Sequence, residues 1–389
     1  MKILFVQTNA FSNNASGVPR VTYNLGRYFK QQGLDVAYFS FKTEGHIEVE
    51  YGELYHAKES NGVSNKNNLT ALKNCIKYFQ PDKVINQMPY MPSLRKVLAQ
   101  QSAAYHFKLI GCIHNSLFPF KNNVKAIMKR NLPMPFNYVM STNLMSKIPL
   151  LYHNIKQRVE LTNMIDVHDK LLLFTHGNYE ELKYFLKPGD FEDQKIGIMT
   201  NPISDIQKEV PKKEKIILHL GRLNIPQKRS DLLLDFWEKA YQDLPDWQFK
   251  VVGDGPYYDT LVADLQKRQL PRIELLGFQK AEPYYKEASL YMMPSAYEGL
   301  PNTIIEANSY GCPVLAFNSY AALKWIVEHN KNALLVKPYD TNKMAQICVD
   351  VAKNAQKLES MQKSALKNAE RFSIQKIGKQ WLELFKKLE

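Results

Sequence analysis

The sequence predicts an α/β protein built from two doubly wound, Rossmann-like domains that face one another across a cleft. Three observations lead to this prediction. Short apolar runs alternate with amphipathic helical stretches along the 389-residue chain, and the alternation restarts after a polar segment near its middle. The strand candidates are apolar on both faces, which is typical of parallel sheets covered on both sides. At roughly 150 residues per domain, the length also fits two domains, each with its own core.

Six strands are expected in the first half of the chain, with amphipathic helices between them. Their positions are 2–7, 36–40, 83–86, 108–114, 170–175 and 195–201. A helix is expected over 18–32, because Val21, Leu25 and Phe29 recur at the spacing of one helical face.

Six further strands are expected in the second half, followed by a closing helix. The strands lie at 215–220, 249–253, 273–277, 290–293, 313–317 and 334–336. The helix, over 373–388, carries four large apolar residues on one face: Ile377, Trp381, Leu382 and Phe385. We therefore expect domains at 1–204 and 205–371, with 372–389 closing back toward the first. In open α/β sheets ligands bind beyond the carboxyl ends of the strands, which places the expected site in the cleft.

The chain is strongly basic. It has 51 Lys+Arg against 38 Asp+Glu, a net charge of +13, which predicts a polyanionic partner: nucleic acid, an anionic membrane surface or a phosphorylated substrate. No acidic residue lies between Asp82 and Glu160, where eleven basic residues do. A solvated basic face is one interpretation. An anionic membrane or acceptor surface is the other, because solvated faces normally mix both signs.

Residues 118–165 interleave basic with large apolar side chains within this acid-free stretch. They include Lys121, Lys125, Lys129, Arg130, Leu132, Met134, Phe136, Met140, Leu144, Met145, Leu150 and Leu151. Such a pattern predicts an interfacial segment lying on an anionic membrane. A helical insertion packed on its own domain remains the alternative.

Cysteine usage and the first residues of the chain point to a cytoplasmic protein. Cys75, Cys112, Cys312 and Cys348 show no C-x-x-C spacing, so buried, reduced thiols are expected. No run of ~18 apolar residues could span a membrane, and the first residues read as a strand rather than a signal peptide. We expect a cytoplasmic protein, peripheral on the inner face of the cell membrane. No D-x-D triplet or metal-ligand spacing occurs, so no metal or other cofactor is expected.

The segment 293–314 carries the most informative motif. A strand runs into a loop with Glu298, and Pro301 stands where a helix over 301–310 would begin. Glu306 lies in the second turn of that helix, so one carboxylate comes from the loop and the other from the helix. The backbone N–H groups of Leu300 and Asn302 would face any anion bound there.

A second motif lies at 219–236, where a strand ends at Gly221. Arg222 and Lys228 flank the loop that follows. A departing nucleoside diphosphate develops negative charge, which two fixed cations would stabilise. Basic residues are nevertheless common at strand ends, so this motif alone has a simpler structural explanation.

Together the two motifs resemble a known family. The pattern PSxYEGLPNxxIEAxxxGCPV is similar to the signature of the retaining glycosyltransferases of family 4, the glycosyl transferases group 1, which have the two-domain GT-B fold. The resemblance is dense over 215–340 and thin before 200. It implies an acceptor-side first domain, a nucleotide-sugar-binding second domain and the residue roles that follow.

In the second domain, the resemblance assigns the donor nucleotide sugar to both motifs and two further loops. Glu298 would contact hydroxyls of the donor sugar, Glu306 the ribose hydroxyls, and Arg222 and Lys228 the diphosphate. The remaining expected donor contacts are Gly253, Phe278, Gln279, Gly299, Leu300 and Pro301. Phe278 and Gln279 would contact the base.

In the first domain, Gly17 would approach the donor phosphate or the acceptor, and His114 would contact the donor sugar. A strand-end histidine such as His114 is otherwise commonly structural. The chain departs from the family in three places. Ser16-Gly17 replaces two adjacent glycines, residues 320–324 replace Gly-Gly plus Glu, and Asn201-Pro202 replaces Asn-Gly.

The resemblance implies a retaining, metal-independent hexosyltransferase that moves a sugar from a nucleotide-diphosphate donor. UDP is more frequent than GDP in the family, and the sequence leaves both open. The acceptor would be a glycan or lipid-linked molecule of bacterial surface polysaccharide or lipopolysaccharide synthesis. In a front-face route Glu298 would position the sugar rather than act as base. A sugar-nucleotide 2-epimerase of the same architecture is the alternative. No nucleic-acid partner is expected, because the chain carries no recognised nucleic-acid module.

Overall fold

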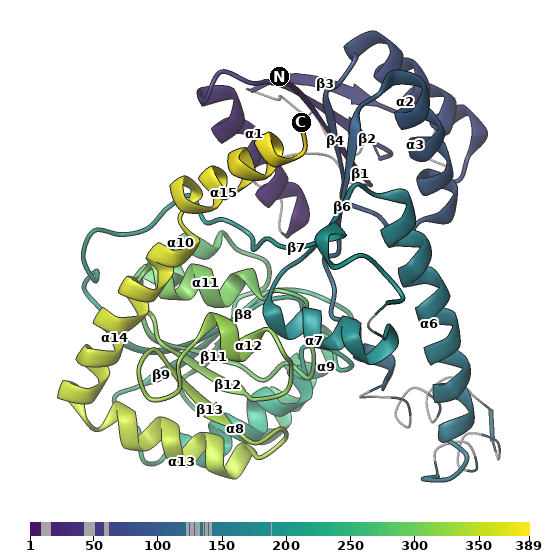
Figure 1. The fold of residues 1–389 in the computed structure, drawn as a ribbon. Helices are drawn as coiled ribbons and strands as arrows, with labels where there is room; N and C mark the ends of the chain where they lie inside the picture. Colours follow the sequence, from purple (N-terminus) through teal and green to yellow (C-terminus); the bar gives the residue numbers. More distant parts are fainter. Residues whose placement is uncertain are drawn as a thin grey trace. The chain divides into compact units, whose positions relative to one another are not determined.

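The computed structural model describes residues 1–8, 17–42, 51–57, 62–121, 142–187 and 189–389, with six isolated positions, 124, 128, 133, 134, 136 and 139, in between. The chain divides into two compact units. Unit 1 comprises Met1–Pro202 and Ile374–Glu389, and unit 2 comprises Ile203–Ser373. Each is a parallel sheet with helices on it (Figure 1). The predicted fold class, two doubly wound α/β domains, is confirmed.

Unit 1 holds a seven-stranded sheet in the order β3-β2-β1-β4-β5-β6-β7. The strands are β1 (Lys2–Gln7), β2 (Asp35–Ser40), β3 (Glu53–His56), β4 (Lys83–Asn86), β5 (Lys108–Cys112), β6 (Lys170–Leu173) and β7 (Ile196–Ile198). Its helices are α1 (Val18–Gln31), α2 (Lys66–Phe79), α3 (Pro92–Tyr105), α6 (Lys147–Val167), α7 (His176–Phe185) and α15 (Ile374–Lys387). All six expected strands are present, and β3 is a seventh that the sequence pattern did not indicate.

Both faces of this sheet are buried, as its continuous apolar strands predicted. Along β1, Leu4 and Val6 pack into one core cluster, while Ile3 and Phe5 pack into another on the opposite face. The second cluster also contains the apolar face of α15. The Phe29 ring of α1 lies 5.2 Å from the Phe385 ring of α15, centroid to centroid. The last helix of the chain therefore completes the core of unit 1.

Unit 2 holds a six-stranded parallel sheet in the order β10-β9-β8-β11-β12-β13. The strands are β8 (Glu214–Leu220), β9 (Gln248–Val252), β10 (Ile273–Leu275), β11 (Ala288–Met293), β12 (Val314–Phe317) and β13 (Ala333–Val336). Its helices are α8 (Leu233–Ala240), α9 (Tyr258–Arg268), α10 (Ala281–Glu287), α11 (Asn302–Ser309), α12 (Leu323–Ile326), α13 (Thr341–Ala352) and α14 (Ala355–Ala369). All six strands expected in this half are present, with ends shifted by one or two residues.

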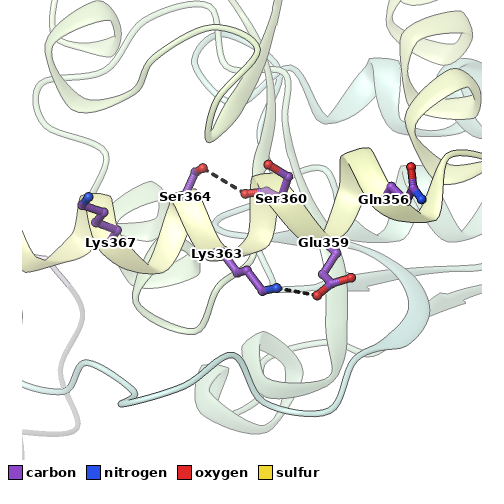
Figure 2. A pocket seen from close by; sticks show the side chains of 6 residues that line it. All are labelled: Gln356, Glu359, Ser360, Lys363, Ser364 and Lys367. Carbon is purple, nitrogen blue, oxygen red and sulfur yellow. Dashed lines mark hydrogen bonds and ion pairs between the residues drawn. The ribbon is translucent and has the colours of Figure 1, made fainter.

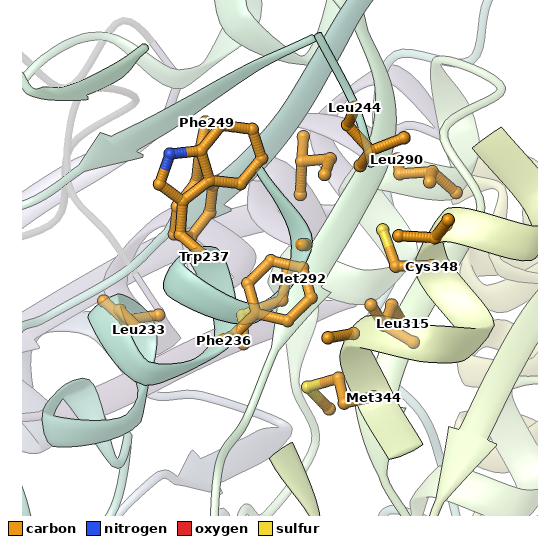
Figure 3. Close-up of a cluster of buried hydrophobic side chains, with 14 of the residues drawn as sticks. Leu233, Phe236, Trp237, Leu244, Phe249, Leu290, Met292, Leu315, Met344 and Cys348 are labelled. Carbon is orange, nitrogen blue, oxygen red and sulfur yellow. The ribbon is translucent and has the colours of Figure 1, made fainter. Parts of the chain in front are cut away.

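One core cluster fills the space between this sheet and helices α8 and α13. Figure 3 shows Phe236 and Trp237 of α8 beside strand residues such as Phe249, with Met344 and Cys348 of α13 across from them. The order of strands places β8 beside β11 at the centre of the sheet, so the loops that leave these two strands are neighbours. All four cysteines of the chain are free and buried, as expected.

Candidate functional site

The carboxyl ends of β8, β9 and β10 are joined by backbone hydrogen bonds between glycine-containing loops. The Gly221 N–H donates to Val252 O at 3.0 Å, and the Gly253 N–H donates to Gly277 O at 2.7 Å. A Cβ at Gly253 would lie 1.9 Å from Gly221 O, and the φ of Gly253 is +144°. Only glycine fits this position, so the loop after β8 and the loop after β9 are held against each other.

The loop after β8 is shaped by Asn224. Its side-chain oxygen accepts from the backbone N–H groups of Gln227 and Lys228, each at 3.1 Å, and its own N–H donates to Ser230 Oγ at 3.0 Å. Asn is well suited to such a turn because its side chain imitates a backbone acceptor. The Gln227 carbonyl in turn accepts from the Ala296 N–H at 2.7 Å, which ties this loop to the loop after β11.

Glu298 lies at the junction of these two loops. Its side chain is 8% exposed, and its Oε1 lies 2.8 Å from Lys228 Nζ. The amide of Gln227 donates to the other oxygen, Oε2, at 3.0 Å. No donor is directed at Oε1 with hydrogen-bond geometry within the described chain, so the Lys228 contact is a charge contact. The structure thus brings two predicted site residues, Glu298 and Lys228, into direct contact.

Arg222 follows β8 directly and differs from Lys228 in its surroundings. Its side chain is exposed and forms no ion pair with any described carboxylate, and its Cγ lies beside Gly255 of the loop after β9. The N–H groups of this exposed guanidinium are therefore available to an anion. Lys228 is partly buried, and its charge is shared with Glu298.

Helix α11 begins at Asn302, one residue later than expected, and ends at Ser309. Pro301 stands at its N-cap, and the Ile304 N–H donates to Pro301 O at 3.0 Å. The N–H groups of the first turn have no acceptor within the helix. Glu306 lies in the second turn, as expected, where its Oε2 accepts from the hydroxyl of Tyr285 at 3.3 Å. Leu300 is buried and Gly299 is half-buried in the loop before the helix.

The loop after β10 presents an aromatic side chain to solvent. Phe278 is 77% exposed. Its neighbour Gln279 is also exposed, and its amide donates to Leu276 O at 3.1 Å. A phenyl ring left in water is a surface on which a planar ligand can stack. The structure gives no contact between these two residues and Glu298 or Lys228.

A buried histidine on β8, His219, is close enough to the ion pair of Lys228 and Glu298 for the charge of Lys228 to affect it. His219 of β8 is 1% exposed, and its Nδ1–H donates to Met292 O at 3.0 Å. The pKa of His219 is lowered to about 4, mainly by burial and to a smaller extent by the positive charge of Lys228. Tyr320, after β12, is also buried, and its hydroxyl has no partner among the described residues. Burial raises the pKa of Tyr320, and the negative charge of Glu298 contributes to the rise.

In unit 1, Gly17 stands immediately before α1. Its φ is +68°, and no other described residue comes within 4 Å of the position its Cβ would take. The positive φ explains the glycine, and among the described residues no atom fills the space beside it. The preceding Ser16 lies outside the described residues.

His114, two residues after β5, is held by a short polar chain. Its Nε2 meets the side-chain oxygen of Gln87, whose amide donates to the hydroxyl of Thr22 on α1 at 3.1 Å. Its ring packs on Phe174 with centroids 5.3 Å apart. Burial lowers the pKa of His114 to about 4, so the ring is neutral at pH 7 with Nε2 protonated. Its Nδ1 has no partner within the described chain and can only accept a hydrogen bond.

Two members of the site were not predicted, Gln227 and Tyr320. Gln227 directly precedes Lys228, but nothing in the sequence indicates that its amide faces Glu298 rather than solvent. Tyr320 was noted only as a departure from the family pattern. The proximity of Tyr320 to Glu298 depends on the pairing of β11 with β12, which places the loops after these two strands side by side.

The acid-free stretch of unit 1 is described in part. Lys125, Lys129, Arg130, Leu132 and Met140 lie outside the described residues. Lys121 lies 3.6 Å from the ring centroid of Tyr184, and Arg95 forms an ion pair with Glu160 at 2.8 Å. Met145 and Leu150 are half-buried, whereas Met134, Phe136, Leu144 and Leu151 are exposed. In the portion of the chain that the structure describes, no helix is long and apolar enough to cross a bilayer.

Two surface hollows of unit 2 lie elsewhere. One, of about 400 Å³, lies on α14, where Figure 2 shows only polar side chains, among them the paired Glu359 and Lys363. The other, of about 680 Å³, lies between α14 and residues 207–213. No predicted site residue lines either of them. Among the described residues, no group of three or more His, Cys, Asp or Glu side chains could hold a metal ion.

Comparisons with known proteins agree with the sequence motifs. Residues 214–354, all within unit 2, match the family model of the glycosyl transferases group 1. An uncharacterised glycosyltransferase of Haemophilus influenzae is 25% identical over 378 residues, 95% of this chain and 96% of the relative.

Two solved structures share the fold of the whole chain. The apo lipopolysaccharide outer core galactosyltransferase WaaB superposes with a TM-score of 0.71 at 18% identity, covering 100% of both chains. The complex of Anabaena HepE with UDP-glucose has a TM-score of 0.71 at 16% identity, also over 100% of both chains. The two parallel sheets of this chain are those of the GT-B fold. Residues 214–354 thus match the glycosyl transferases group 1, and the chain as a whole is similar to glycosyltransferases of the GT-B fold.

Proposed function

We propose that the protein is a retaining, metal-independent hexosyltransferase that transfers a sugar from a UDP-sugar to a glycan or lipid-linked acceptor. One observation carries this proposal. A buried carboxylate, Glu298, is held by Lys228 and Gln227, while the exposed guanidinium of Arg222 starts the same loop. A site for a sugar joined to a diphosphate needs this combination, an acceptor of hydroxyl hydrogen bonds next to cations.

The nucleotide half of the donor is assigned to the loops and helix around that pair. Arg222 and Lys228 hold the diphosphate, assisted by the N–H groups at the start of α11. Glu306 accepts hydrogen bonds from the ribose hydroxyls. The exposed ring of Phe278 stacks on the base beside Gln279, and Gly253 and Gly299 allow close approach of the backbone.

The sugar half is assigned to Glu298, His114 and the backbone at Leu300 and Pro301. Because Glu298 is already held by a cation and an amide, it is suited to position hydroxyls rather than to remove a proton. His114 is neutral at pH 7, so its free Nδ1 accepts a hydrogen bond from a sugar hydroxyl. Gly17, immediately before α1, is assigned to a phosphate of the donor or to the acceptor.

We infer a front-face transfer. The acceptor oxygen attacks the anomeric carbon on the side from which the diphosphate leaves. The new carbon–oxygen bond forms as the bond to the β-phosphate oxygen breaks, and the acceptor proton passes to that departing oxygen. Arg222 and Lys228 then neutralise the charge of the released UDP, the role in which preorganised cations lower the barrier most.

The nucleotide and the acceptor class rest on relatives. The similar Anabaena HepE is described in complex with UDP-glucose, and the similar WaaB is named a lipopolysaccharide outer core galactosyltransferase. We therefore propose UDP as the nucleotide and a bacterial surface polysaccharide or lipopolysaccharide as the product. The enzyme would then act in the cytoplasm, peripheral to the inner face of the cell membrane.

The donor is best identified by ligand-induced stabilisation. A thermal-shift screen of UDP- and GDP-sugars should raise the melting temperature with one UDP-sugar, since a ligand of the native state stabilises it. Stabilisation by GDP-sugars alone would overturn the nucleotide assignment. Conversion of the sugar nucleotide to its 2-epimer without any acceptor would identify an epimerase instead.

The role of Glu298 is tested by Glu298→Gln. We expect kcat/KM for transfer to fall by about 10²–10³-fold, or about 3–4 kcal/mol of transition-state stabilisation. Glu359→Gln is the matched control, because Glu359 is an exposed carboxylate on α14 paired with Lys363. Near wild-type turnover of Glu298→Gln would contradict the proposed site.

A further inference from the structure

The outer face of α6 and the turn before it exposes a row of large apolar side chains. Six residues form this apolar face: Leu144, Ile148, Leu151, Tyr152, Ile155 and Val159. Each is between 55% and 72% exposed. Figure 1 shows that the amino-terminal half of α6 extends beyond the seven-stranded sheet of unit 1. Soluble proteins rarely leave so many neighbouring apolar side chains in water without a partner for them.

The spacing of these residues makes them one continuous stripe. At about 100° per residue, the five that lie on α6 itself fall within an arc of about 100°, and they span about 16 Å along the helix at 1.5 Å per residue. Leu144 lies in the turn before them. The side chains that α6 buries, Leu161, Met164 and Ile165, lie nearer its carboxyl end, in the core of unit 1. The stripe is therefore separate from the face by which α6 packs on its own domain.

Basic residues border the stripe on both sides. At about 100° per residue, Lys147 and Arg158 fall along one edge and Lys156 along the other. Lys147 and Lys156 are exposed, and Arg158 is paired with Asp190 at 2.8 Å. No acidic residue occurs from 83 to 159, and Glu160, the first after it, is held by Arg95. The face thus combines apolar side chains with a positive border, in which Lys147 and Lys156 form no ion pair with any described carboxylate.

We propose that this apolar face docks on an anionic lipid bilayer, with α6 lying in the plane of the interface. A stripe of about 100° bordered by lysines is the pattern by which a helix inserts its apolar side among lipid chains while its cations meet anionic head groups. A second copy of the chain is a poorer occupant, because two such faces would bring four unpaired lysines together. This inference goes beyond the transfer reaction, and its test needs neither donor nor acceptor.

The test uses the full chain with vesicles of phosphatidylcholine alone or mixed with phosphatidylglycerol. We expect co-sedimentation with the mixed vesicles at low ionic strength, and weakening of that binding as salt is added. The triple variant Ile148→Ser/Leu151→Ser/Ile155→Ser should bind them more than tenfold more weakly. Tyr78→Ser is the matched control, because Tyr78 of α2 is 77% exposed but stands apart from the stripe.

A second variant separates the charge from the apolar contact. The variant Lys147→Gln/Lys156→Gln should bind the mixed vesicles severalfold more weakly than the wild type, and its binding should depend much less on salt. Both variants should keep the wild-type melting temperature and its increase with UDP, which shows that unit 2 and the fold are intact. A failure of the proposed donor would appear in that UDP shift and not in the vesicle binding.

Three results would overturn the proposal. One is the absence of wild-type binding to anionic vesicles at low ionic strength. Another is equal binding by the triple variant. The third is concentration-dependent self-association in sedimentation velocity that the triple variant abolishes, which would identify the face as an interface between two copies of the chain.

Discussion

Units 1 and 2 are both doubly wound parallel sheets, yet their polar residues are arranged very differently. In unit 2, Lys228, Gln227 and Glu298 meet at the ends of β8 and β11, and the family match lies entirely within this unit. In unit 1, a neutral histidine follows β5 and a glycine precedes α1, while the unusual feature is an apolar face on α6. The comparison teaches that one architecture can carry a dense ionic site or a surface, because function depends on the side chains placed on it.

The largest expected effect tests whether Arg222 of unit 2 holds the leaving diphosphate. Arg222→Ala should lower kcat/KM by about 10²–10³-fold, about 3–4 kcal/mol, because one of two cations that neutralise the departing UDP is lost. The melting temperature should not change, since Arg222 is exposed and forms no ion pair within the described chain. Steady-state kinetics measures the effect, with the exposed Lys267→Ala of α9 as control. Equal losses in both variants would mean that general surface charge, not Arg222, matters.

The next effect concerns stability rather than rate. Lys228→Met should lower the free energy of unfolding by about 3 kcal/mol, because it leaves the buried carboxylate of Glu298 without its cation. Adding Glu298→Gln to the same chain should restore most of that loss, since no charge remains to be compensated. Urea unfolding of both single variants and the double variant measures the coupling. Additive losses would show that the two side chains do not interact.

Acid pH should destabilise both units by a similar mechanism. His168 in unit 1 and His219 in unit 2 are each 1% exposed, and burial lowers the pKa of each to about 4. The unfolded chain, with an ordinary histidine pKa near 6.5, takes up protons first as the pH falls. Stability is therefore full above about pH 6.5 and is lost between pH 6.5 and 4, by about 2 kcal/mol per histidine at pH 5.

Single substitutions separate the two contributions. His168→Gln and His219→Gln should each reduce the loss of unfolding free energy between pH 7 and pH 5, in urea titrations at the two pH values. In His168, Nδ1–H donates to Met164 O at 2.6 Å and Nε2 faces the amide of Asn86 at 3.2 Å, so a second proton would have no acceptor. An unchanged pH dependence in both variants would contradict the assignment of neutral, buried histidines.

The smallest expected effect concerns Gln227 as a positioning residue. Gln227→Leu removes one hydrogen bond to Glu298 but leaves the Lys228 contact, so we expect a loss of about 1 kcal/mol in the transition state. This corresponds to a roughly fivefold lower kcat, with the affinity for UDP unchanged in calorimetric titration. A merely structural role would instead lower the melting temperature and leave kcat in place.

Most of the fold follows from the apolar pattern, and the exception has a physical cause. The edge strand β3 reads ELYH, is half-exposed and pairs on only one side, so it lacks the continuous apolar run of a central strand. The motif residues of unit 2 were likewise recognisable as a set. What the sequence could not indicate is the contact of Gln227 with Glu298, 71 residues away, or the neutral state of His219, because both depend on how loops pack and on burial.

The return of α15 to unit 1 has a consequence for synthesis on the ribosome. Unit 2 is a continuous segment, complete once residue 373 has emerged, whereas unit 1 lacks Trp381 and Phe385 of its core until residues 374–389 have emerged as well. The domain that begins the chain is thus the last that can finish folding, and the inserted domain can form first. Termination of the chain at residue 373 would therefore leave unit 2 intact and expose the aromatic surface of α1 around Phe29.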